Sequence, residues 1–174
     1  MTQSGEKMFS WDSIYTVEFS FLVKVNFFPT ILVPKGYVDD GHTGIPDWHE
    51  PKKTGLPEAV IAHVHDFGYQ HRRLADGAEM NTNAKGFWDQ LYKEMFDASN
   101  RWIKRGISGT LLRGLRYFAG PAWDARKEPD PLKPEWEHLF GVTKSAMDAR
   151  LRMPIVRVHY NTGRLVMDPP ERID

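Results

Sequence analysis

The residues with the clearest chemical potential are His65, Asp66 and Tyr69, which stand close together in the mostly apolar stretch 58–69. On a helix, His65 and Tyr69 lie one turn apart on the same face. Asp89 follows on a second amphipathic segment, and two antiparallel helices would bring it across from His65. A carboxylate bonded to one imidazole nitrogen fixes the tautomer and leaves the other nitrogen free to take a proton from water. This pattern predicts a general base.

Asp66 is turned about 100° from His65 on the same helix, so it can serve a different partner. Together with Asp40 and loop carbonyl groups it would form an all-oxygen site, which suits calcium. A bound cation there would polarise an ester carbonyl and hold the resulting oxyanion. The chain has no cysteine and no serine in a Gly-x-Ser-x-Gly elbow, so water is the expected nucleophile.

Two other interpretations of these residues remain open. His63 precedes His65 by two positions and would form a zinc site with His42, His49 or His71. Residues two apart on a helix point about 200° away from each other, which argues against one metal taking both. Asp76 is an alternative orienting acid in place of Asp89, although a loop aspartate more often caps a turn.

The segment from His65 to Tyr69, His-Asp-Phe-Gly-Tyr, resembles the His-Asp-x-x-Tyr helix of phospholipase A2 enzymes, especially the bacterial secreted ones. Residues 88–92, Trp-Asp-Gln-Leu-Tyr, are similar to the second helix of those enzymes. Residues 31–125 also resemble DUF1353, a phage and prophage family of unknown function. The resemblance to that family rests on the order of Val-Pro-Lys-Gly-Tyr at 33–37, Asp40, Ile45-Pro46 and the helix that ends near Tyr69.

The resemblance implies His65 as the general base, with Asp89 orienting it and Tyr69 supporting the pair by a hydrogen bond. It implies Asp66 and Asp40 as calcium ligands, joined by the carbonyl group of Gly41. The sequence departs from these enzymes in three ways: it has no disulfides, it lacks the glycine-rich spacing of the calcium loop, and it places His42 and Thr43 where the phage family prefers small residues.

The elements that must position these residues follow from periodicity. Alternating apolar residues predict a strand over 14–28, and a short strand is expected over 31–33. The loop 37–46 leads toward the helix over 58–69, and a second helix is expected over 84–103. A third helix is predicted over 108–118, a further helix over 136–151, and a hairpin formed by 155–160 and 164–167. The expected fold is α+β, with N-terminal strands, a phospholipase A2-like antiparallel helix pair and a C-terminal helix and hairpin appendage.

We expect a domain over 1–127 and an extension over 128–174 that begins with a proline-rich linker. The chain has 174 residues and a net charge of zero, so bulk attraction to nucleic acid is not indicated. Neither a signal peptide nor an apolar run of about 20 residues is present, which fits synthesis in a host cytoplasm. The resemblance extends this expectation to incorporation in a phage particle.

The expected function is calcium-dependent hydrolysis of a lipid ester at a phospholipid surface by a phage-type, phospholipase A2-like protein. One alternative is a non-catalytic structural or accessory virion protein that contacts other virion proteins and retains the fold. A second alternative is a phosphoesterase that depends on zinc or another metal. The oligomeric state does not follow from the sequence.

Overall fold

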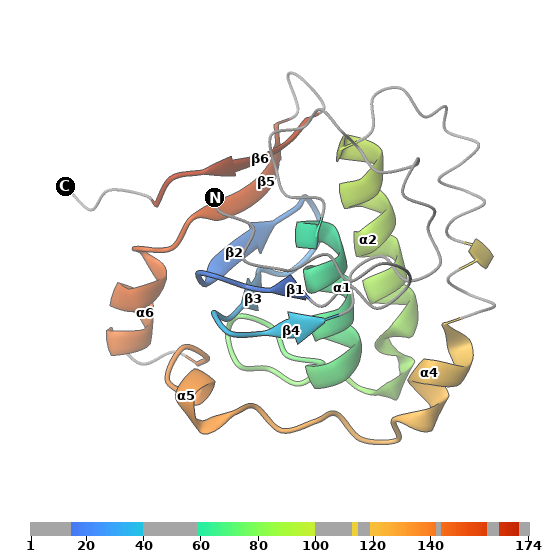
Figure 1. The fold of residues 1–174 in the computed structure, drawn as a ribbon. Helices are drawn as coiled ribbons and strands as arrows, with labels where there is room; N and C mark the ends of the chain where they lie inside the picture. The colour runs from blue at the N-terminus through green and yellow to red at the C-terminus, as the bar shows by residue number, and fades with distance from the viewer. Residues whose placement is uncertain are drawn as a thin grey trace.

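The computed structural model describes residues 15–39, 59–99, 113–114, 119–141, 144–159 and 164–170. These residues form a mixed α+β fold with a four-stranded sheet, a two-stranded sheet and several helices (Figure 1). The strands are β1 (Tyr15–Thr16), β2 (Phe21–Lys24), β3 (Ile31–Val33), β4 (Val38–Asp39), β5 (Ile155–His159) and β6 (Arg164–Asp168). The helical segments are α1 (Ala59–His71), η2 (Thr82–Ala84), α2 (Lys85–Ser99), α4 (Gly120–Ala125), α5 (Pro134–Glu137) and α6 (Lys144–Arg150).

The four-stranded sheet has the order β3-β2-β5-β6. β2 pairs with β3 in antiparallel fashion and with β5 in parallel, in a register that sets Leu22 against Ile155. β5 and β6 form the antiparallel hairpin that the sequence predicts. β3 consists of three fully buried β-branched or leucine residues, and such residues suit a strand that packs on both sides.

Two helices cover this sheet (Figure 1). α1 contacts β3 and β4, α2 contacts β6, and the two helices pack against each other. They run antiparallel, because Tyr69, late in α1, meets Asp89, whereas His65, one turn earlier, meets Tyr92. The core lies between the helix pair and the sheet, with Phe67, Trp88 and Val156 among its fully buried members.

Particular residues mark the end of α1 and the start of the helical segment that leads into α2. α1 ends where Arg72 adopts a left-handed backbone with φ of 51°, and its amide still donates to the carbonyl of Gly68 at 3.0 Å. Before α2, the Oδ1 of Asn81 accepts a bond from the amide of Asn83 at 2.9 Å, which caps the short η2 turn. The amide of Met80 donates to the carbonyl of Arg72 at 2.8 Å, which ties the end of α1 to the segment that leads into η2 and α2.

Some predicted elements are interrupted. The strand predicted over 14–28 is wrong in its extent: β1 and β2 are separate, and the amide of Val17 instead bonds the carbonyl of Tyr37 at 2.9 Å. The helix predicted over 136–151 is likewise wrong in extent, because Gly141, with φ of 105°, separates α5 from α6. Most of the predicted third helix, over 108–118, lies outside the described residues.

The C-terminal part of the chain joins the same sheet and core as the N-terminal part. Residues 128–174 are predicted to form an appendage, but β5 is an inner strand of the sheet, between β2 and β6. Trp136 is also buried, and its Nε1 donates to the carbonyl of Lys35 at 2.9 Å. The segment from α4 to α5 crosses one end of α1, where the amide of Asp130 donates to the carbonyl of Gln70 at 2.8 Å (Figure 1).

Candidate functional site

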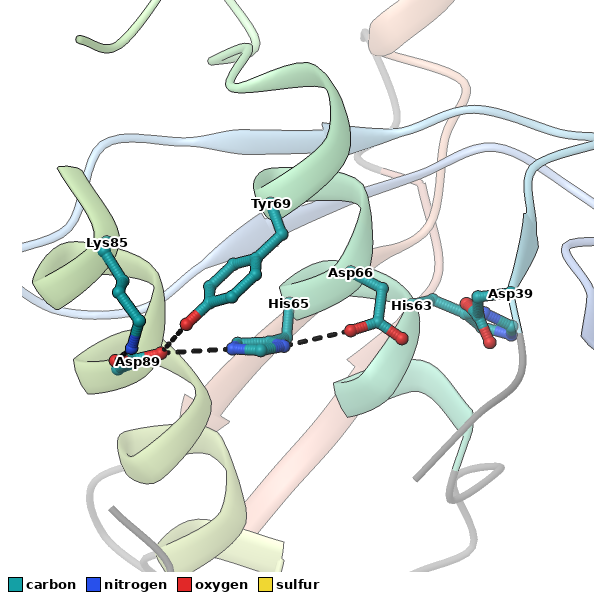
Figure 2. A network of polar contacts seen from close by, with 7 residues as sticks. All are labelled: Asp39, His63, His65, Asp66, Tyr69, Lys85 and Asp89. Atoms are coloured by element: carbon teal, nitrogen blue, oxygen red, sulfur yellow. Dashed lines mark hydrogen bonds and ion pairs between the residues drawn. The ribbon is translucent and has the colours of Figure 1, made fainter. Parts of the chain in front are cut away.

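A chain of buried polar side chains connects α1 to α2 (Figure 2). His65 and Tyr69 stand one turn apart on α1, with their ring centroids 4.1 Å apart. Asp89 and Lys85 stand one turn apart on α2 and face them. The antiparallel packing of two amphipathic helices therefore brings Asp89 to His65 and Tyr69, although Asp89 follows them by 24 and 20 residues in the sequence.

Asp89 is the centre of this network. Its Oδ1 accepts a hydrogen bond from the Tyr69 hydroxyl and lies 3.3 Å from Nε2 of His65, just beyond the roughly 2.6–3.2 Å expected for catalytic contacts. Its Oδ2 accepts a bond from Nζ of Lys85 at 2.6 Å. Asp89 is only 1% exposed. A carboxylate removed from water in this way needs all of these partners.

The surroundings shift the pKa values of Asp89 and Tyr69 in opposite directions. Burial alone would raise the pKa of Asp89, but hydrogen bonds from His65, Lys85 and Tyr69 outweigh it, and the pKa lies below its ordinary value. Burial raises the pKa of Tyr69, and its hydrogen bond to Asp89 raises it further. Tyr69 therefore remains a hydroxyl donor, and Asp89 remains an anion across the neutral range.

His65 has a carboxylate at each ring nitrogen. Its Nδ1 lies 3.0 Å from Oδ1 of Asp66, and its Nε2 faces Asp89. Burial would lower the pKa of His65, but the hydrogen bonds to Asp66 and Asp89 prevail and raise it. A neutral imidazole carries one N–H, so it can donate to only one of the two carboxylates. Nδ1 can take a proton from water only after Asp66 has turned away.

The network opens to solvent at Asp66. The Asp66 side chain is 30% exposed, whereas the side chains of His65 and Asp89 are 7% and 1% exposed. Water or a substrate would therefore reach His65 from the Nδ1 side, past Asp66. Figure 2 shows Asp66 on the opposite side of the imidazole from Asp89.

The structure adds residues that the sequence analysis missed. Lys85 was not identified, although it stands four residues before Asp89, the spacing of a helical ion pair. Gly68 was not identified either. A Cβ at this position would lie 2.2 Å from the indole of Trp88, so the glycine permits the close approach of α1 to α2. The sequence feature that could have identified Gly68 is a glycine between Phe67 and Tyr69, inside a predicted helix.

A second buried histidine and carboxylate pair lies on another side of α1. Nδ1 of His63 bonds Oδ2 of Asp39, which ends β4 (Figure 2). The sequence suggests His63 only as a ligand of the zinc alternative, and its contact with Asp39 was not predicted. His71 lies on the same helix, and its Nδ1 bonds the carbonyl of Asp130 at 3.0 Å. Both histidines therefore tie α1 to neighbouring segments.

The predicted metal sites are described only in part. Asp40 and Gly41 lie outside the described residues, as do His42 and His49 of the zinc alternative. Within the described ranges, no group of three or more His, Asp or Glu side chains is arranged to hold a metal ion. Asp66 alone does not make a calcium site, so the calcium prediction depends on residues 40 and 41.

Three further residues lie outside this network. Oδ1 of Asp76 accepts the amide of Ala78 at 2.9 Å in an exposed turn, so Asp76 is a turn residue and does not orient His65. Trp123 and Trp136 are core residues. Trp123 also packs on the ring of Tyr69 with centroids 4.9 Å apart, behind the polar network.

Comparisons with protein-family models, curated proteins and solved structures find no match to this chain. In the part of the chain that the structure describes, no helix is both long and apolar enough to cross a bilayer.

Proposed function

We propose that this chain is a phospholipase A2-like hydrolase that cleaves a lipid ester with water activated by His65. The observation that carries the proposal is the contact of His65 with Asp89, made across two antiparallel helices and supported by Tyr69. The resemblance of the His-Asp-Phe-Gly-Tyr segment to phospholipase A2 enzymes adds the substrate class. A core similar to those enzymes and membership of the phage family DUF1353 are parts of the same proposal, with a place in the host cytoplasm or in a phage particle.

In the proposed reaction, the Asp89 carboxylate accepts a hydrogen bond from the N–H at Nε2 and holds the ring, so that Nδ1 carries the lone pair. Once Asp66 has turned away, water hydrogen-bonds to Nδ1 and gives up its proton as its oxygen attacks the ester carbonyl carbon. The imidazolium then returns that proton to the departing alkoxide oxygen, which leaves a fatty acid and an alcohol. No bond forms between enzyme and substrate.

Asp66 has two roles in this proposal. In the structure its Oδ1 is hydrogen-bonded to Nδ1 of His65, which is the nitrogen that must bind water in the reaction. We place Asp66, Asp40 and the carbonyl of Gly41 around a calcium ion, which when bound would polarise the ester carbonyl and stabilise its oxyanion. The Asp66 carboxylate suits the role of a calcium ligand, because it is an oxygen donor and is partly exposed, whereas Asp89 is buried.

A second candidate function is that of a non-catalytic structural or accessory virion protein. The observation that favours it is the occupation of both nitrogens of His65 by carboxylates. A histidine protonated between Asp66 and Asp89 would hold α1 against α2 as a structural ion network. The phosphoesterase alternative has no comparable support among the described residues.

Release of fatty acid from phospholipid vesicles, with calcium or with a chelator, separates these functions. His65→Gln keeps a polar side chain but removes the base, and should lower the rate by about 10²- to 10⁴-fold. Asp66→Asn should remove the calcium dependence together with the activity. The control is His71→Gln, the same change at a buried histidine of α1 outside the network.

The control should keep the wild-type rate once its lower stability is taken into account by working well below its melting temperature. Equal release by wild type and His65→Gln would show that the activity does not arise at this site. An inactive wild type under every metal condition would support the non-catalytic function.

A further inference from the structure

The two oxygens of Asp89 have separate partners. Oδ1 faces Tyr69 and His65 on α1, and Oδ2 binds Nζ of Lys85 on its own helix at 2.6 Å. A carboxylate can rotate about its Cβ–Cγ bond and exchange its two oxygens. The bond from Lys85 holds one oxygen on α2, and this leaves the other oxygen directed at α1 (Figure 2).

Lys85 stands at the start of α2, a place where a positive charge is unfavourable. It is the first residue of α2, where the positive end of the helix dipole disfavours a cation. Its side chain is only 19% exposed, and Nζ lies 5.7 Å from the centre of the Tyr69 ring. A lysine turned inward at the start of a helix indicates that its contact with Asp89 has a use beyond helix stability.

The same helix offers a second ion pair for comparison. Nζ of Lys93 binds Oδ2 of Asp97 at 2.6 Å, with the same spacing of four residues. The Asp97 side chain is 35% exposed, whereas that of Asp89 is 1% exposed. Water can replace Lys93 at Asp97, and such exposed pairs contribute little. Water has no comparable access to Asp89, so the loss of Lys85 would leave a buried oxygen without its cation.

We propose that Lys85 is a positioning residue for the hydrolysis, holding Asp89 in the rotation that aligns the imidazole of His65. This inference rests on the proposed function. Without Lys85, Oδ2 would lose its partner, the Asp89 carboxylate could rotate away from Tyr69 and His65, and the His65 ring would lose its fixed orientation. Displacements of about 1 Å in a catalytic group can cost on the order of 10²-fold in rate.

The test compares Lys85→Met, Lys85→Arg and the matched control Lys93→Met in the vesicle assay. Lys85→Met keeps the length of the chain but not the charge, and should lower kcat by about 10- to 100-fold, the range of a hydrogen bond to a charged group. KM should stay near the wild-type value, because Lys85 does not reach the solvent-facing side of the network. Lys85→Arg should recover most of the rate, and Lys93→Met should not change it.

A measurement without turnover distinguishes this inference from the proposed function. In spectra of ¹⁵N-labelled protein, the ring signals of His65, assigned by their loss in His65→Gln, should move in Lys85→Met and stay unchanged in Lys93→Met. Unmoved ring signals, or a loss of rate that Lys85→Arg does not recover, would overturn the positioning role. A wild type without His65-dependent release would refute the proposed function, while the ring signals would still decide whether Lys85 positions His65.

Discussion

The close approach of α1 and α2 makes a specific prediction for Gly68→Ala. In an ordinary helix this change stabilises by about 0.5–1 kcal/mol, because alanine has less backbone freedom to lose than glycine. Here the new Cβ would lie 2.2 Å from Cε3 of Trp88 and 2.3 Å from Cδ2. Both atoms belong to a rigid ring that is fully buried, so the ring cannot swing into solvent.

The size of the effect follows from this contact. The indole or the helix would have to move by more than 1 Å to reach the 3.4 Å of an ordinary contact. Overpacking of this kind costs about 1–3 kcal/mol, and more in tight sites. It exceeds the gain in helix propensity, so we expect a net loss of stability. For a chain of this size, each 1 kcal/mol lowers the melting temperature by about 2–4 °C.

Gly86→Ala is the matched control for this experiment. Gly86 lies in α2 next to Lys85, and a Cβ there would have no neighbour within 4 Å. Thermal and urea unfolding of both variants should show Gly86→Ala to be as stable as wild type or more so, and Gly68→Ala to be less stable. If Gly68→Ala were stabilised as much as Gly86→Ala, the helix pair could not be packed as described, and the contact of His65 with Asp89 would lose its support.

Three further predictions concern the network and the core. Tyr69→Phe keeps the ring but removes one of the donors to the buried Asp89 carboxylate, so urea unfolding should show a loss of about 1.5–3 kcal/mol, and an unchanged midpoint would refute the bond. Burial lowers the pKa of His71, so the unfolded chain binds its proton more readily and stability should fall below about pH 6.5. The raised pKa of His65 has the opposite effect: its contribution to stability is complete below about pH 6.5 and is lost as the pH rises above it. Comparison of wild type with His71→Asn therefore isolates the His71 effect. Equal slopes of stability against pH for the two proteins, from about pH 7 to 5, would contradict it. Removal of residues after 128 should abolish cooperative unfolding, because it removes an inner strand of the sheet, and a sharp transition in the truncated chain would show a separate domain.

The sequence predicted the helix pair well because its pattern is local. Apolar residues at helical spacing define α1 and α2, and the offset of four residues sets His65 and Tyr69 on one face. The antiparallel arrangement then follows from the loop between them. The hairpin of β5 and β6 was predicted for the same reason, since both strands lie within one short stretch of the sequence.

The features that the sequence did not predict depend on contacts between distant segments. The place of β5 beside β2 requires a parallel pairing between residues 22–24 and 155–157, which no local pattern records. The second partner of His65 was missed because Asp66 was assigned to a metal, and adjacent helical residues were not expected to contact each other. Lys85 was missed because a lysine on an amphipathic helix is usually solvated.

The parallel pairing of β2 with β5 has a consequence for how the protein is made. β2 and β3 lie within the first 33 residues, yet the strand that completes them begins at residue 155. At about 5–20 residues per second, synthesis leaves the open edge of β2 unpaired for on the order of ten seconds. Contacts this distant along the chain slow folding, and an uncovered apolar edge can join a second nascent chain. Slower translation between these strands should therefore lengthen the time for which the edge of β2 is open to such contacts.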